Sequence, residues 1–194
     1  MKTLIIIGLL IAISIHASIA QKNRFGISGG IGNGIIMKQA LEGGAGYDLN
    51  SSFSLGFQYE RKLSGPLYFM AGGTWYKSSV FVTPSFQPGL NMPASSYDLQ
   101  VIYLPIMLKL EFAKYLFVNG GLIADVDVTP NRYITNQSGV GAGFGIGAQV
   151  PIRKKFLVQL NPYLNFHGLL MADTDQYPER VLDSGVKLSF LLRR

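Results

Sequence analysis

Hydrophobic and polar side chains alternate along most of this chain after Gln21, with a period of two, in segments of about ten residues. Residues 51–61 show it most clearly, because phenylalanine, leucine and tyrosine there alternate with serine, glycine, glutamine and glutamate. Such alternation is typical of a β-strand with one apolar and one polar face. The pattern predicts eight strands, at residues 25–36, 51–61, 67–82, 97–112, 115–128, 138–150, 156–168 and 181–193.

The connections between these segments are of two kinds. Three are short and turn-like: 62–66, 113–114 and 151–155. Four are long and polar or rich in proline, asparagine and aspartate: 37–50, 83–96, 129–137 and 169–180. Short and long connections alternate strictly, so all the short ones are expected at one end of the sheet. This asymmetry is typical of outer-membrane β-barrels, and an even strand number places both chain ends on the short-turn side.

The composition also indicates a protein that faces lipid. Hydrophobic residues make up 48% of the chain, mean hydropathy is +0.25, and charged residues make up only 14%. A soluble domain carries about 25% charged residues. The part of the chain after residue 20 has no apolar run of about 20 residues that could form a transmembrane helix. A closed barrel is the other structure that can span lipid. We therefore predict an all-β fold, an eight-stranded antiparallel up-and-down transmembrane β-barrel.

The first 20 residues, MKTLIIIGLLIAISIHASIA, have the features of a secretory signal peptide. Lys2 provides a minimal basic region, an apolar run follows, and Ser18 and Ala20 provide small residues before the cut. An uncleaved N-terminal helix is the alternative. The expected organisation is a cleaved signal peptide at 1–20 and a barrel domain at 21–194, exported to the cell outer membrane.

Residues 138–150, SGVGAGFGIGAQV, raise the question of a phosphate-binding loop. The nucleotide-binding pattern fits only in a relaxed form ending at Ala148, and Pro151 would interrupt the helix that such a loop must open. A flexible linker would lack the large apolar residues between the glycines. A strand with a bare face toward a narrow lumen accounts for both features. That face is Gly139, Gly141, Gly143, Gly145 and Gly147.

Several other functions are disfavoured by residue content. The chain has no cysteine, which excludes disulfides and thiolate metal sites. Its net charge of +6 is spread along the sequence, so we expect no nucleic-acid partner. Asp125 and Asp127 could attract a divalent ion, but they lack a loop of alternating oxygen ligands. We expect no metal and no cofactor.

The sequence YLPIMLKLEF at 103–112, followed by AKYLFVNGGLIADV at 113–126, resembles the PorT-like outer-membrane β-barrel family. The family's middle strands carry a similar leucine, proline and lysine run, a short turn and a glycine-containing strand; here the proline directly follows Leu104. The resemblance implies an integral outer-membrane protein of a Gram-negative bacterium, in a family with some members linked to protein secretion. The chain departs from the pattern by ending in Arg193 and Arg194 rather than in an aromatic residue.

The polar faces of the predicted strands place a set of large polar residues inside the lumen, near the short turns. Buried charges are costly unless paired, so we expect the lysines to neutralise the glutamates in a hydrogen-bonded plug. A narrow selective pore lined by the same groups is the alternative, which the small diameter of an eight-stranded barrel disfavours. The set is Glu60, Lys109, Glu111, Asn119, Gln149, Gln159, Asn161 and Lys187.

His167 is the only histidine after residue 20 and is predicted at the loop-side end of its strand, level with Asp125 and Asp127. A rim histidine, a carboxylate and a serine could form the catalytic group of a lipid-modifying barrel enzyme. No motif selects a serine among Ser78, Ser79 and Ser138. We therefore expect no catalytic residue and no enzymatic activity.

The expected role is that of a scaffold, an anchor or an accessory subunit in the outer membrane. The expected partners are membrane lipid and lipopolysaccharide, with other outer-membrane or periplasmic proteins as further candidates. The alternatives are the narrow pore, the lipid-modifying enzyme and a secreted lipocalin-like binder, which would need an apolar interior and a charged exterior.

Overall fold

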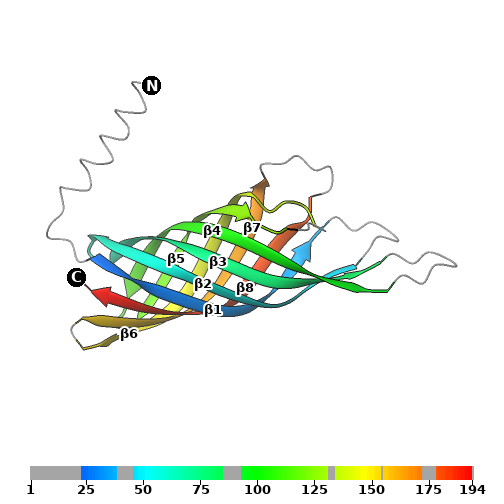
Figure 1. The fold of residues 1–194 in the computed structure, drawn as a ribbon. Helices are drawn as coiled ribbons and strands as arrows, with labels where there is room; N and C mark the ends of the chain where they lie inside the picture. The colour runs from blue at the N-terminus through cyan, green and yellow to red at the C-terminus, as the bar shows by residue number, and fades with distance from the viewer. Residues whose placement is uncertain are drawn as a thin grey trace, which may run out of the picture.

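The computed structural model describes residues 23–38, 46–84, 93–130, 134–153, 155–171 and 178–193, and the predicted signal peptide lies outside them. Eight strands form a closed antiparallel barrel in chain order, as predicted (Figure 1). The described residues contain no helix long and apolar enough to cross a membrane. The strands are β1 (Asn23–Met37), β2 (Gly46–Ser64), β3 (Leu67–Thr83), β4 (Ser95–Phe112), β5 (Leu116–Asp127), β6 (Gly139–Ile152), β7 (Phe156–Met171) and β8 (Arg180–Arg193).

Short and long connections lie at opposite ends of the barrel, as the sequence predicted. The tight turns β2–β3, β4–β5 and β6–β7 lie at one end, where β1 also begins and β8 ends (Figure 1). Each of these turns uses one residue with a positive φ: Gly65 at 48°, Ala113 at 55° and Arg153 at 58°. A left-handed residue of this kind reverses the chain within a few residues.

Two strand boundaries differ from the prediction. β2 begins five residues early, at Gly46 rather than at residue 51, because its register with β3 shifts between Leu49 and Ser52. Such a bulge offsets the period of two, so alternation alone does not reveal the strand on its far side. β6 continues through Pro151, which the prediction placed in a turn.

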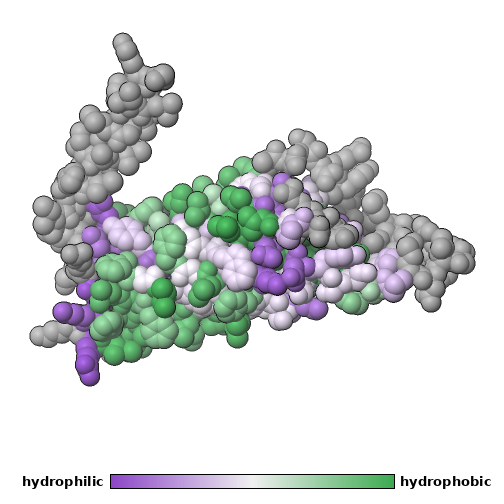
Figure 2. Space-filling model, in the orientation of Figure 1, coloured by the Kyte–Doolittle hydropathy of each residue, from purple (hydrophilic) through white to green (hydrophobic). Residues whose placement is uncertain are grey.

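The outer surface is apolar over the half of the barrel next to the short turns and more polar over the half next to the long loops (Figure 2). In β2, Phe53, Leu55 and Phe57 point outward and are 47–62% exposed, whereas Ser52 and Ser54 point inward and are buried. The alternation therefore separates a lipid-facing surface from an interior, as the sequence predicted. Because the apolar surface covers only part of the barrel's length, it defines a band that matches the hydrocarbon layer of a membrane.

The interior has two chemically different layers. Charged and amide side chains occupy the end near the short turns, and an apolar cluster occupies the end near the long loops. Buried polar side chains also lie beside this cluster in the loop-side half, among them Ser52, Asp125, His167 and Asp183. In β3 and β4 both faces carry large hydrophobic or aromatic residues there, so alternation could not separate the two faces. The apolar cluster is Leu49, Met70, Tyr76, Val80, Leu99, Val101, Tyr103, Met107, Ile123 and Val181.

The bare inner face of β6 gives side chains of neighbouring strands the space they fill. A Cβ atom at Gly147 would lie 2.5 Å from the Phe117 ring, and one at Gly143 would lie 2.5 Å from Met107 Cε. The odd-numbered glycines from 139 to 147 point inward while Phe144 and Ile146 point outward and are 57% and 52% exposed. The glycine-rich segment is therefore a wall of the lumen, and the close packing of an eight-stranded interior depends on it.

We expect Gly147→Val to lower the free energy of unfolding by about 1–3 kcal/mol, the usual cost of overpacking. The added side chain would collide with the Phe117 ring and with the Leu160 carbonyl, both 2.5 Å from the new Cβ. Ala148→Val, on the lipid-facing side of the same strand, should change it by less than about 0.5 kcal/mol. Urea unfolding in lipid vesicles measures both, and equal effects would contradict the inward assignment of the glycines.

Candidate functional site

The most distinctive polar feature of the interior is a charged layer near the short turns, formed by Arg24, Glu60, Lys109 and Glu111. Arg24 Nη1 donates to Glu60 Oε2 at 3.1 Å and also to Glu111 Oε1. Lys109 Nζ donates to Glu60 Oε1 at 2.9 Å and lies 3.5 Å from Glu111 Oε1. Two cations thus face two carboxylates, and the layer carries no net charge.

Amide side chains complete the hydrogen bonds of the charged layer. Lys109 Nζ also donates to Gln149 Oε1 at 2.9 Å. Gln58 and Gln159 each donate to Glu60 Oε1 at 2.9 Å. Glu60 and Lys109 are fully buried, so each would be costly to desolvate alone. The network supplies the paired, fully bonded geometry that makes burial of these charges tolerable.

Aromatic rings surround the two cations. The Arg24 guanidinium lies 4.1 Å from the centre of the Tyr68 ring, and its Nη2 donates to the Tyr68 hydroxyl at 2.6 Å. Lys109 Nζ lies 4.4 Å from the centre of the Phe117 ring. Cation–π contacts of this kind add attraction where water is excluded.

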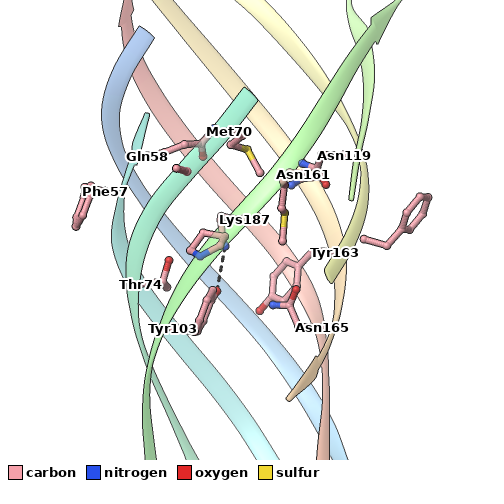
Figure 3. A pocket seen from close by; sticks show the side chains of 14 residues that line it. Phe57, Gln58, Met70, Thr74, Tyr103, Asn119, Asn161, Tyr163, Asn165 and Lys187 are labelled. Atoms are coloured by element: carbon pink, nitrogen blue, oxygen red, sulfur yellow. Dashed lines mark hydrogen bonds between the residues drawn. The ribbon is translucent and has the colours of Figure 1, made fainter. Parts of the chain in front are cut away.

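The predicted lumen set comes together only in part. Glu60, Lys109, Glu111, Gln149 and Gln159 meet in or beside the charged layer, as their bonds above show. The expected pairing of Lys187 with a glutamate is wrong. Its Nζ instead donates to the Tyr103 hydroxyl at 3.1 Å, further toward the long loops (Figure 3).

Arg24 is the functional residue that the sequence reasoning missed. The alternation predicts a first strand at 25–36, which excludes Arg24, whereas β1 begins at Asn23. Extending the alternation back by one position would have placed this side chain on the inner face, because Phe25 points outward with 43% exposure.

Asn119 and Asn161 line a small cavity of about 30 Å³ beside the charged layer, together with Lys187 (Figure 3). Asn119 Nδ2 and Asn161 Oδ1 are buried and make no hydrogen bond within the described part of the chain. A cavity of this size holds about one or two water molecules, which could bridge a free donor and a free acceptor. The cavity is too small for a larger solute.

His167 lies inside the barrel rather than at an open rim, which corrects the expectation. Its side chain is 1% exposed, and its ring centroid lies 5.7 Å from that of Tyr76 and 5.5 Å from that of Tyr103. His167 Nδ1 lies 2.9 Å from Asp125 Oδ1. The β6–β7 register shifts here, and Gly168 takes a φ of 59°. This bulge turns His167 toward Asp125, whose Oδ2 accepts from the Gly168 N–H at 3.3 Å.

Asp127 organises the start of a long loop. Its carboxylate accepts from the backbone N–H of Thr129 at 2.9 Å and of Gln137 at 3.0 Å. Its own N–H donates to Ser138 Oγ, so this serine is engaged away from His167. Ser78 Oγ donates to the Asn50 carbonyl. Within the described residues no group of three or more histidine, aspartate or glutamate side chains is placed to hold a metal ion.

Comparison with known proteins supports the fold. No family model and no curated protein matches the chain. Among solved structures it is similar to the outer membrane protein OprG from Pseudomonas aeruginosa, with a TM-score of 0.55, 11% identity, and coverage of 90% of this chain and 95% of that one. It is also similar to the outer membrane protein AlkL in DMPC bilayers, with a TM-score of 0.51, 9% identity, and coverage of 90% and 89%. At these identities the likeness shows an eight-stranded barrel of the outer-membrane type.

We expect Glu60→Gln to destabilise the folded barrel by about 3–5 kcal/mol, the usual cost of breaking a buried ion pair. The change leaves two buried cations to share Glu111 while keeping the shape of the side chain. Lys77→Gln breaks an ion pair of 2.7 Å with Asp98, both about half exposed, and should cost less than about 1 kcal/mol. Urea unfolding in vesicles compares the two variants. A similar small loss for both would show that the charged layer contributes little to stability.

Proposed function

We propose that this chain is an integral outer-membrane barrel with a closed lumen, which serves as a scaffold, an anchor or an accessory subunit rather than as a channel. The charged layer carries this proposal. Arg24 on β1 bonds to Glu111 on β4, and Lys109 on β4 bonds to Gln149 on β6. These strands are not neighbours in the barrel, so the bonds cross the lumen and obstruct it.

A second barrier supports the same conclusion. The apolar cluster fills the loop-side half, where Tyr76, Tyr103 and Ile123 are at most 1% exposed. The cluster reaches the charged layer directly, since Met70 lies opposite Glu60, and the cavity of about 30 Å³ lies beside this contact. A solute would have to displace both layers in order to pass. Fixed groups that block a narrow barrel in this way leave its outer surface and its loops as the places where it can act.

Outer-membrane location and family membership are parts of this proposal. The apolar outer band, the barrel fold and the expected signal peptide favour an outer-membrane location, with membrane lipid and lipopolysaccharide as neighbours. Membership of the PorT-like family rests on the run at 103–112 with its Leu104–Pro105 step. That membership would favour a role beside other envelope proteins, including those of secretion.

The competing functions find less support. A lipocalin-like binder needs an exterior that faces water, yet Ile31 and Leu122 are exposed on the outside at 70% and 59%. For a lipid-modifying enzyme, His167 would have to reach a substrate and a serine. It is buried beside Asp125, and no hydrogen bond joins it to a serine within the described residues. We therefore propose a non-enzymatic role.

The purified barrel in a planar lipid bilayer should show no steady conductance, because the charged layer closes the lumen. The double variant Glu60→Ala/Lys109→Ala removes a bonded pair together and leaves Arg24 balanced by Glu111. It should fold, and because the apolar cluster still closes the loop-side half, it should show at most a small rise in conductance. Lys77→Ala/Asp98→Ala removes an equal pair from the outside and should remain closed. Steady, large conductance of the unmodified barrel would overturn the closed-lumen proposal.

Membrane fractionation tests the location separately. The protein should sediment with outer membranes and stay in the pellet after carbonate extraction, because its apolar band must remain in lipid. Release into the soluble periplasmic fraction would instead favour the lipocalin-like alternative. Capture of a stoichiometric protein partner from gently solubilised membranes would identify the accessory role.

A further inference from the structure

The apolar band contains three outward-facing glycines, Gly29, Gly73 and Gly120, and a phenylalanine ring covers two of them. A Cβ atom at Gly73 would lie 2.6 Å from Phe57 Cε1, and one at Gly120 would lie 3.6 Å from Phe144 Cδ2. In both cases the ring comes from the residue directly opposite on the adjacent strand. The aromatic side chain thereby shields backbone that the glycine would leave bare.

Gly29 on β1 lacks such a cover. Its neighbours in register are Leu55 on β2 and Leu188 on β8, and only the Ser54 carbonyl, at 3.8 Å, lies within 4 Å of a Cβ placed there. The residues on either side, Ile27 and Ile31, point outward and are 64% and 70% exposed. An uncovered glycine in a strand often marks a place where a ligand or another backbone approaches closely.

This glycine forms the floor of a groove of about 460 Å³ in the outer surface. Apart from Ser28 and the glycines, every residue that lines the groove is hydrophobic. Ile27, Phe53, Leu55, Leu188 and Phe190 form its walls. The groove lies within the apolar band, so its shape and chemistry match a hydrocarbon chain that runs along the barrel wall.

The groove leads into a wider hollow of about 880 Å³ at the loop-side edge of the band, with both apolar and polar residues in its lining. The two share Ile31, Phe53 and Val186. The hollow lies where the β1–β2 ladder ends, at Gly32 and Ser52. Hydroxyl and amide groups dominate its polar lining, which also includes one lysine; these residues are Asn33, Ser51, Ser52, Lys77, Ser78, Ser79 and Ser184.

We propose that the groove and the hollow together bind one molecule of the acylated, phosphorylated glycolipid of the outer leaflet, the lipid A part of lipopolysaccharide. This inference rests on the proposed outer-membrane location, in which the long loops face outward. One acyl chain lies in the groove over Gly29. The sugar hydroxyls meet the serine and asparagine side chains of the hollow, and a phosphate meets Lys77.

The hydrogen-bonding chemistry of the hollow fits this head group. Ser52, Ser78 and Ser184 already donate within the barrel, but a serine oxygen can still accept from a sugar hydroxyl, and Ser51 and Ser79 also line the hollow. Lys77 Nζ bonds to Asp98 at 2.7 Å and retains two further N–H donors for a phosphate. Its side chain is 40% exposed, and a ligand can therefore reach it without rearrangement of the barrel.

Gly29→Leu tests the site, because its side chain would fill the groove and the backbone has room for it. Ala124→Leu, on the lipid-facing side of β5, is the matched control. The full barrel, purified in detergent, is titrated with lipid A and the bound stoichiometry is read by native mass spectrometry. We expect one lipid A on the unmodified protein and on the control, and at least about tenfold weaker binding to Gly29→Leu, which is a tenfold rise in Kd.

Two further variants separate the acyl groove from the head-group hollow. Lys77→Gln should weaken lipid A binding roughly threefold to tenfold, because it removes a charge-assisted hydrogen bond to the phosphate. Leu188→Ala removes a groove wall and should weaken binding even if Gly29→Leu does not fold. A heat-dependent shift in gel mobility verifies that each variant is folded.

The proposal would be overturned if Gly29→Leu and Leu188→Ala bound lipid A as tightly as the unmodified protein. Equal or tighter retention of a phospholipid, phosphatidylethanolamine, would also overturn it, since the site would then not recognise a glycolipid. The assay uses detergent and does not depend on cellular location. If the protein lies in outer membranes but does not bind lipid A, only this inference is contradicted. Release of the protein from membranes contradicts the proposed function.

Discussion

Closure of the hydrogen-bonded ladder between β1 and β8 is the constraint on which the rest of this structure depends. Pairing from Arg24–Arg193 to Met37–Arg180 joins the first strand to the last, so the sheet has no free edge along this seam. Backbone polar groups are then satisfied within the sheet, and the outer face can consist of hydrocarbon side chains. The period of two follows from this closure, because each strand must present one face to lipid and the other to a narrow interior.

A narrow interior forces large and small residues to complement one another across strands. The bare inner face of β6 accepts Phe117 and Met107, and β1 is similarly thinned by glycines at 30 and 32. β1 lies between β2 and β8, and across its bare inner face Ser52 on β2 donates a hydrogen bond of 3.1 Å to Asp183 on β8. Proline also shapes the wall: the β3–β4 ladder is interrupted at Pro105 and the β6–β7 ladder at Pro162, because proline has no N–H to donate.

The division of the interior into a charged layer and an apolar cluster has a functional consequence. The charged layer is neutral as a whole and fully bonded, so it seals the barrel at a low electrostatic cost. The apolar cluster seals the other half by close packing and holds the pair of His167 and Asp125 away from solvent. Because both layers block the lumen, the protein can contact other molecules only through its long loops and its outer wall. The uncovered Gly29 and the hollow beside it are features of that wall.

Local periodicity and turn composition were enough to predict the fold class, the number of strands, the end at which the short turns lie and the faces of most strands. Alternation also identified Glu60, Lys109 and Gln149 as inward-facing residues. Which of these groups meet is visible only in the folded barrel, since the partners are brought together by register across strands distant in sequence. The tertiary structure selected Arg24 rather than Lys187 as the second cation of the charged layer, and it buried His167 through a bulge that alternation does not reveal. The apolar half of the interior was likewise invisible in the sequence, because a strand with two hydrophobic faces does not indicate which one points inward.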